Sequence, residues 1–152
     1  MGILAGIVFA LSALVAEAGP AQDSETKVNL EGLPPAVVEA VKAQSQGATL
    51  RGVAKEVRGG VTLYEAEMTV EGRIKDVTID ARGKIVSIEE QTTLNEIPAA
   101  ARAAIENAVG TGKLVLVEKV TEGGRTFFEG HISDGHKERE VKVDDKGKPV
   151  EL

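Results

Sequence analysis

The chain has 152 residues, of which 18 are basic and 24 acidic, giving a formal net charge of −6, and it contains no Cys and no Trp. The lack of Cys excludes a disulfide-stapled mini-protein, a thiolate metal site and an enzyme with a Cys nucleophile. The acidic balance argues against a dedicated nucleic-acid-binding protein, because such a protein needs a basic surface. We therefore expect one or two small domains whose partners do not include nucleic acid.

The first 18 residues form an apolar segment. Fourteen of them are apolar, Glu17 is their single charged residue, and Ala16-Glu17-Ala18 has the small-x-small form that signal peptidase accepts. No Lys or Arg precedes the apolar run, which is shorter than the roughly 20 residues that span a bilayer. We predict a signal peptide over residues 1–18 and a secreted or periplasmic protein with no membrane span after cleavage. The alternative is a buried N-terminal helix.

Residues 19–29 are polar, contain Gly and Pro, and show no periodicity, so we predict a linker. The remaining chain contains an internal repeat with an offset of 64 residues, which divides it into units 30–92 and 93–152. Three blocks carry the match. They are an apolar-Pro pair (Leu33-Pro34, Ile97-Pro98), a Gly-Gly pair followed by an aromatic strand (59–65, 123–129), and a Val-x-Ile/Val-Asp-x-x-Gly-Lys-x-Val ending (77–86, 141–150).

Each unit is predicted to form one helix followed by four strands. Pro34 and Pro98 suit the first position of a helix, and apolar residues at four-residue spacing behind them give each helix one narrow apolar stripe. Turn signals then follow every 11 or 12 residues, which is typical of antiparallel meanders. The predicted fold class is α+β, with two tandem α-β-β-β-β repeats whose helices pack on one face of an antiparallel sheet of up to eight strands.

Strand alternation separates the two faces of the predicted sheet. Two-residue turns would place Tyr64 opposite Ile79 and Phe128 opposite Val141 on the face that the helices cover. Nothing left in the chain is long enough to cover the other face. We predict that this open face binds a partner, and that it carries Leu63, Glu65, Glu67, Phe127, Glu129 and His131.

Two large apolar residues at equivalent exposed positions, Leu63 and Phe127, suggest a recognition surface on the open face. Scattered surface apolar residues are the alternative explanation. A basic patch on the partner would suit the acidic chain better than an acidic one.

The two histidines provide a second hypothesis. A two-residue turn at Asp134-Gly135 would bring His131, His136 and Glu138 to one face of a hairpin tip, and two imidazoles with a carboxylate can ligate zinc. The group would lie at an exposed tip without surrounding residues to orient it, so we expect no metal and no other cofactor. We also expect no catalytic residues, because neighbours on one hairpin do not form a catalytic pocket.

The three repeat blocks resemble the PepSY-like group, which is similar to β-lactamase-inhibitor proteins, over essentially all of residues 30–152. The resemblance implies a secreted or periplasmic tandem α-β4 module with a shared eight-stranded sheet and an inhibitory or protein-binding role for the concave sheet face. Pro149 interrupts the last predicted strand, which fits an edge position.

The sequence therefore predicts an exported, non-enzymatic protein that binds an extracytoplasmic protein or peptide, with inhibition of a peptidase or other enzyme as one consequence of binding. A small-ligand or metal-binding envelope module is the alternative.

Overall fold

The computed structural model describes residues 24–151, so the predicted signal peptide lies outside the described residues. The elements in chain order are β1 (Ser24–Val28), η1 (Leu30–Gly32), α1 (Pro35–Gln44), β2 (Thr49–Arg58), β3 (Val61–Val70), β4 (Arg73–Asp80), β5 (Ile85–Gln91), α2 (Ala99–Val109), β6 (Lys113–Glu122), β7 (Arg125–Ser133) and β8 (Glu138–Val143).

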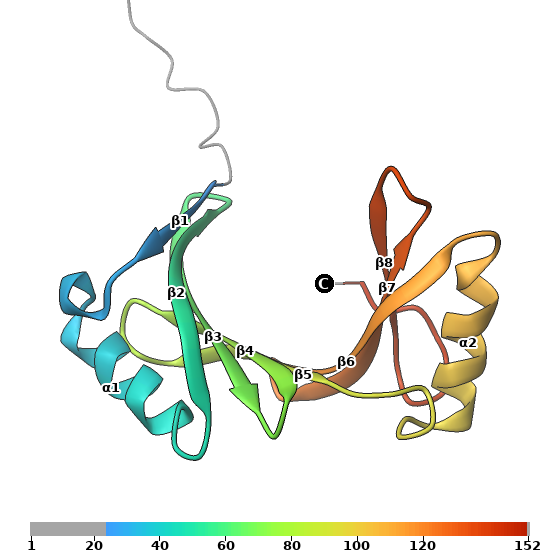
Figure 1. Cartoon of the computed structure of the whole chain (residues 1–152), viewed down its shortest axis with the longest axis horizontal. Helices are drawn as coiled ribbons and strands as arrows, with labels where there is room; N and C mark the ends of the chain where they lie inside the picture. The colour runs from blue at the N-terminus through green and yellow to red at the C-terminus, as the bar shows by residue number, and fades with distance from the viewer. Residues whose placement is uncertain (1–23, 152) are drawn as a thin grey trace, which may run out of the picture.

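The eight strands form one antiparallel sheet in which every strand pairs with its neighbour in sequence. The sheet bends so that its two ends rise, and α1 and α2 lie on its outer, convex side (Figure 1). Pairing of β5 with β6 joins the two repeats into one continuous sheet. The predicted α+β class, with two helices on one face of an eight-stranded antiparallel sheet, is therefore confirmed.

The number of strands that each repeat contributes differs from the prediction. Residues Ser24–Val28, in the segment predicted as a linker, form edge strand β1 on β2. The second repeat supplies only three strands, and its predicted fourth strand is reduced to a single bridge between Val143 and Pro149. Pro149 has no N–H to donate to a ladder, which explains the missing strand. Val28 and Leu30 pack against the first core and so hold β1 in place.

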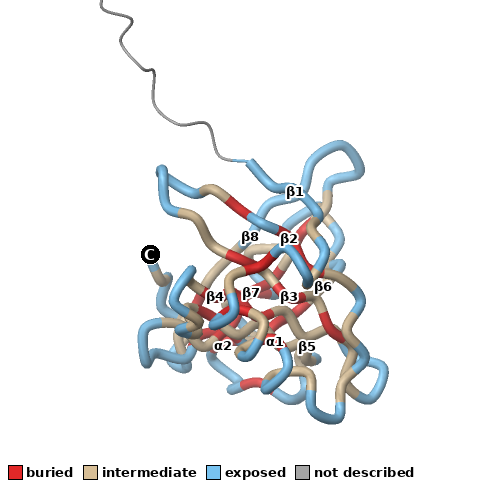
Figure 2. Tube along the Cα trace, turned by 90° about the vertical axis from the view of Figure 1, so that its left-hand side faces the viewer, coloured by how far each residue is buried: buried red, intermediate tan, exposed pale blue. Residues whose placement is uncertain are grey.

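Both helices begin directly after the predicted prolines, which occupy the N-cap positions of α1 and α2. Their predicted apolar stripes are buried and face two separate hydrophobic cores on the convex side of the sheet. Figure 2 shows the buried segments concentrated in the middle of the strands, while the turns are exposed. The stripe residues with the lowest exposure are Val37, Val41, Ala101 and Ile105.

Strand register follows the prediction in the first repeat and departs from it in the second. Tyr64 lies opposite Ile79, as expected. Phe128 lies opposite Val143 instead of Val141. The β7–β8 connection has four residues because the Asp134 carboxylate accepts hydrogen bonds from the backbone N–H groups of His136 and Lys137, which closes a longer turn. The shift of two residues keeps each side chain on its predicted face but changes its partner.

Within residues 24–151, no helix is both long and apolar enough to cross a membrane.

Candidate functional site

The concave face of the sheet carries the residues that were predicted to bind a partner. Strand pairing places the members of this set on one face: Leu63, Glu65, Glu67, Phe127, Glu129 and His131. Both helices pack on the opposite face, so the concave face faces the space between the two raised ends of the sheet (Figure 1). The structure therefore brings the set onto a single surface, although its members differ greatly in exposure.

The prediction that Phe127 is an exposed contact residue is wrong. Phe127 is only 1% exposed, and its cross-strand neighbour Val120 is 2% exposed. On a concave surface, side chains of neighbouring strands converge, so a large ring loses its contact with water without a covering helix. Leu63, its equivalent in the first repeat, is half-buried. The more exposed apolar residue on this face is Val61, at the start of β3, which is 58% exposed.

Carboxylates dominate the rest of the concave face. Following the paired positions from β2 to β8, they are Glu56, Glu65, Glu67, Asp76, Glu89, Glu118, Glu129 and Glu140. Glu56, Glu118 and Glu129 are each less than 10% exposed. Burying charged carboxylates is costly unless each finds a cation, a hydrogen bond or a proton. The way in which this cost is met differs between the two repeats.

In the first repeat, Glu65 meets another carboxyl group. Burial, followed by hydrogen bonding and charge repulsion from Glu56, raises the pKa of Glu65 to about 8. The carboxyls of Asp76 and Glu89 raise it further, and burial also raises the pKa of each of those two residues. These neighbours therefore favour the protonated form of Glu65 at neutral pH.

In the second repeat, Glu129 meets a lysine. Lys142 Nζ lies 3.3 Å from Glu129 Oε2 and 3.5 Å from Glu140 Oε2, so one ammonium group bridges two carboxylates. Burial and a hydrogen bond that the protonated Glu129 donates to Glu140 raise the pKa of Glu129 to about 7, against the opposing charge of Lys142. The same hydrogen bond lowers the pKa of Glu140.

His131 belongs to this second cluster. Its Nε2 lies 2.8 Å from Oε2 of Glu118, a carboxylate that is 3% exposed. The hydrogen bond to Glu118 raises the pKa of His131 despite its partial burial. The imidazole therefore gives the buried carboxyl of Glu118 a hydrogen-bond partner.

The predicted metal group of His131, His136 and Glu138 does not form. His131 pairs with Glu140, while His136 lies in the four-residue turn and Glu138 pairs with Ser133. The longer turn explains this result, because it moves the register by two residues.

A different trio, Glu129, His131 and Glu140, has ligand atoms within 4.8 Å of one another. Lys142 already contacts both of its carboxylates, so the geometry is that of an ammonium site, in which a metal ion would have to displace the lysine.

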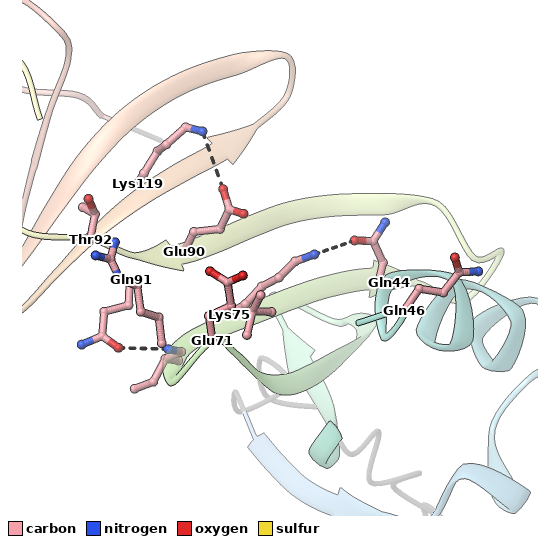
Figure 3. A pocket seen from close by; sticks show the side chains of 11 residues that line it. Gln44, Gln46, Glu71, Lys75, Glu90, Gln91, Thr92 and Lys119 are labelled. Atoms are coloured by element: carbon pink, nitrogen blue, oxygen red, sulfur yellow. Dashed lines mark hydrogen bonds and ion pairs between the residues drawn. The ribbon is translucent and has the colours of Figure 1, made fainter. Parts of the chain in front are cut away.

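A groove of about 590 Å³ lies on the opposite, helix-bearing face, beside the end of α1 (Figure 3). Several of its charged groups already have partners. Lys75 Nζ donates to Gln44 Oε1 at 3.1 Å, and Lys119 Nζ lies 3.6 Å from Glu90 Oε2. These mutual contacts leave the concave face as the stronger candidate for binding.

The sequence analysis missed several residues of the concave face. They are Glu56, Asp76, Thr78, Glu89, Glu118, Glu140 and Lys142. Alternation along each strand would have indicated the face to which each belongs. Their neighbours, however, depend on the register between strands, and the register of the last hairpin was predicted incorrectly.

No protein-family model and no curated protein matches the sequence. Solved structures do match. A protein from Bacteroides eggerthii that is provisionally assigned to the periplasm has a TM-score of 0.63 and 19% identity over 78% of this chain and 86% of that one. A DUF2874 family protein from Bacteroides ovatus has a TM-score of 0.59 and 17% identity over 78% and 85% of the two chains.

A BLIP-like protein also matches. It comes from Bacteroides fragilis and has a TM-score of 0.57 and 23% identity over 78% of this chain and 84% of that one. At these identities the matches establish the fold. This chain therefore has the BLIP-like fold, which the resemblance of its repeat blocks implied.

Proposed function

We propose that this chain is an exported, non-enzymatic binding module that holds an extracytoplasmic protein or peptide against the concave face of its sheet. The observation that supports this most directly is a sheet face that no helix within residues 24–151 covers but that carries a continuous run of partly and fully buried carboxylates. A face that served only as solvated surface would not need to bury Glu56, Glu118 and Glu129.

Four further observations support the individual parts of this proposal. The apolar segment 1–18 supports export, as does the provisional periplasmic assignment of the Bacteroides eggerthii protein. The open shape of the concave face supports binding without catalysis, because an open sheet does not enclose a substrate away from water as a catalytic cleft does. Inhibition of an enzyme is the specific consequence that the BLIP-like fold suggests, and it belongs to the same proposal.

A capture experiment with mapping tests the proposal. The protein would be immobilised and incubated with an extracytoplasmic extract beside two variants. One variant carries Glu65→Arg and Glu67→Arg on the concave face, and the other carries Glu106→Arg on the exposed side of α2. A specific partner should be captured by the parent and the α2 variant but lost from the concave-face variant.

Hydrogen exchange on the purified complex would then locate the contact. We expect protection on β3, β4 and β7 and none on α1 or α2. Equal capture by all three proteins, or protection confined to the helices, would contradict the proposal.

The metal-binding alternative is tested by thermal unfolding with added zinc. We expect no increase in the melting temperature, because Lys142 occupies the position between the two carboxylates. An increase that disappears in His131→Ala would favour the alternative function instead.

A further inference from the structure

The two repeats treat one equivalent residue pair differently. Glu65 and Glu129 are related by the 64-residue offset, as are Thr78 and Lys142, and each glutamate lies directly opposite its β4 or β8 partner. In the second repeat, the ammonium of Lys142 therefore reaches Glu129 from the adjacent strand. In the first repeat the adjacent strand presents Thr78, which cannot supply a positive charge.

The first repeat still gathers the carboxylates that an ammonium would need. Glu65 and Glu56 share a hydrogen bond, and both lie on the concave face. Glu56 is 6% exposed, and its buried Oε2 accepts no hydrogen bond from the part of the chain that the structure describes. Arg58 Nη2 approaches this oxygen to 2.6 Å from the rim of the sheet, but its side chain is 55% exposed and the contact lacks hydrogen-bond geometry.

On this basis, and resting on the proposed function, we infer that Glu56 and Glu65 form a binding site for a primary ammonium group, supplied by a lysine side chain of the docked partner. Lys142 shows how an ammonium is held by Glu129, the equivalent of Glu65, together with a second carboxylate, Glu140. The equivalent of Glu140 is Asp76, which Arg51 already contacts at 3.3 Å, so Glu56 is the second carboxylate left beside Glu65. Lysine suits the site better than arginine because it is a compact point charge on a flexible chain, which can reach into a buried pair of carboxyls.

Binding at this site releases a proton. The partner's ammonium keeps its three hydrogens, and the proton that Glu65 shares with Glu56 passes to the solvent. The groups that face Glu65 are Glu56 on β2, Asp76 on β4 and Glu89 on β5. The nearby cations are Arg58 and Arg51 on β2, which contact Glu56 and Asp76, and Lys27 on β1. Since the three acidic neighbours all favour the protonated state of Glu65, an incoming cation reverses the local balance of charge.

The test uses NMR titration with a short peptide that contains two lysines, and the same peptide with both lysines acetylated. The lysyl peptide should shift resonances of β2, β3 and β4, with affinity increasing from pH 6 to pH 9 as the shared proton is lost. The acetylated peptide should bind at least ten-fold more weakly. Equal binding of the two peptides would overturn the inference.

Two substitutions at position 78 distinguish the site from general attraction to an acidic surface. Thr78→Lys places an ammonium of the protein itself beside Glu65, as Lys142 does beside Glu129. This variant should reduce affinity for the lysyl peptide at least ten-fold. Thr78→Val changes the same buried position without adding charge and should retain binding. If Thr78→Lys does not fold, Glu65→Gln replaces it, with the same expected loss.

Unchanged binding in the folded Thr78→Lys protein, or in Glu65→Gln, would overturn the inference. The capture experiment described under the proposed function separates the two ideas. A partner lost from the concave-face variant, combined with no response to the lysyl peptide, would remove the ammonium site and leave the binding face in place.

Discussion

The two repeats are alike on the convex face of the sheet and different on the concave face. On the convex face, Val37 and Val41 of α1 correspond to Ala101 and Ile105 of α2, and each pair is buried against its own core. On the concave face, Glu65 and Glu129 each hydrogen-bond to a carboxyl, but only Glu129 also binds an ammonium, that of Lys142 on the adjacent strand. The fold depends on the convex face, which must bury a helix, so the repeats are free to diverge on the other.

The last turn of each repeat is another feature that the two repeats have in common. Asp80 and Asp144 each accept two backbone hydrogen bonds within an Asp-x-x-Gly turn. The glycine that follows, Gly83 or Gly147, has a positive φ and lies against the first turn of the helix of its own repeat. Each repeat therefore fixes its helix with the same turn, and the two helices take equivalent places on the sheet.

The largest expected effect concerns Phe127 and Leu63, which are equivalent in sequence but unequal in burial. Phe127→Ala should lower the free energy of unfolding by about 3–5 kcal/mol, because it empties a buried aromatic position. Leu63→Ala should cost only about 1 kcal/mol, as expected for a half-buried side chain. Urea unfolding of both variants measures the difference, and equal losses would show that the burial of Phe127 contributes nothing specific.

The second effect concerns the shared turns. A Cβ at position 147 would lie 2.6 Å from the carbonyl oxygen of Ala100, and φ there is +75°. Gly147→Ala should therefore destabilise the protein by about 3 kcal/mol, of which the left-handed conformation accounts for roughly 1–2 kcal/mol. Gly72→Ala is the matched control, because φ at position 72 is +83° and a Cβ added there would have none of the contacts under 4 Å that a Cβ at position 147 would make. In thermal unfolding, Gly72→Ala should lower the melting temperature clearly less than Gly147→Ala.

The third effect converts the second repeat into the first. Lys142→Thr removes the ammonium that bridges Glu129 and Glu140, and should cost about 2 kcal/mol at neutral pH. It should also raise the pKa of Glu129, as measured by carboxyl-carbon NMR titration. If the inference about the first repeat is correct, this variant gains a second site for the lysyl peptide. A variant with full stability and an unchanged Glu129 pKa would contradict the comparison.

The fourth effect is on the pH dependence of stability. The pKa of Glu65 rises from 4.5 to about 8 on folding, so the folded state binds the proton more tightly than the unfolded state. The stabilisation it provides is present below about pH 4.5 and is lost as the pH rises through about 8. Glu65→Gln should flatten this decline in urea-unfolding curves recorded between pH 5 and pH 8.5. The same decline in parent and variant would show that Glu65 is not its source.

Much of the fold could be predicted from local signals. Pro34 and Pro98 mark the helix starts, and the buried stripes follow from the four-residue spacing of the apolar residues behind each proline. The Tyr64–Ile79 pair followed from a two-residue turn. The last hairpin could not be predicted in the same way, because the Asp134 carboxylate closes a four-residue turn where Asp-Gly suggested two. The four-residue turn places Glu140 opposite His131, so the predicted trio of His131, His136 and Glu138 does not form.

The sequence by itself determined the repeat, the α+β class and the face to which each strand residue points, because these depend on the local periods of helices and strands. Only the tertiary structure decided which strand completes the sheet at its first edge, how deeply Phe127 is buried, and which charges meet across strands. These properties depend on register and on the curvature of the whole sheet, to which residues distant in sequence contribute together.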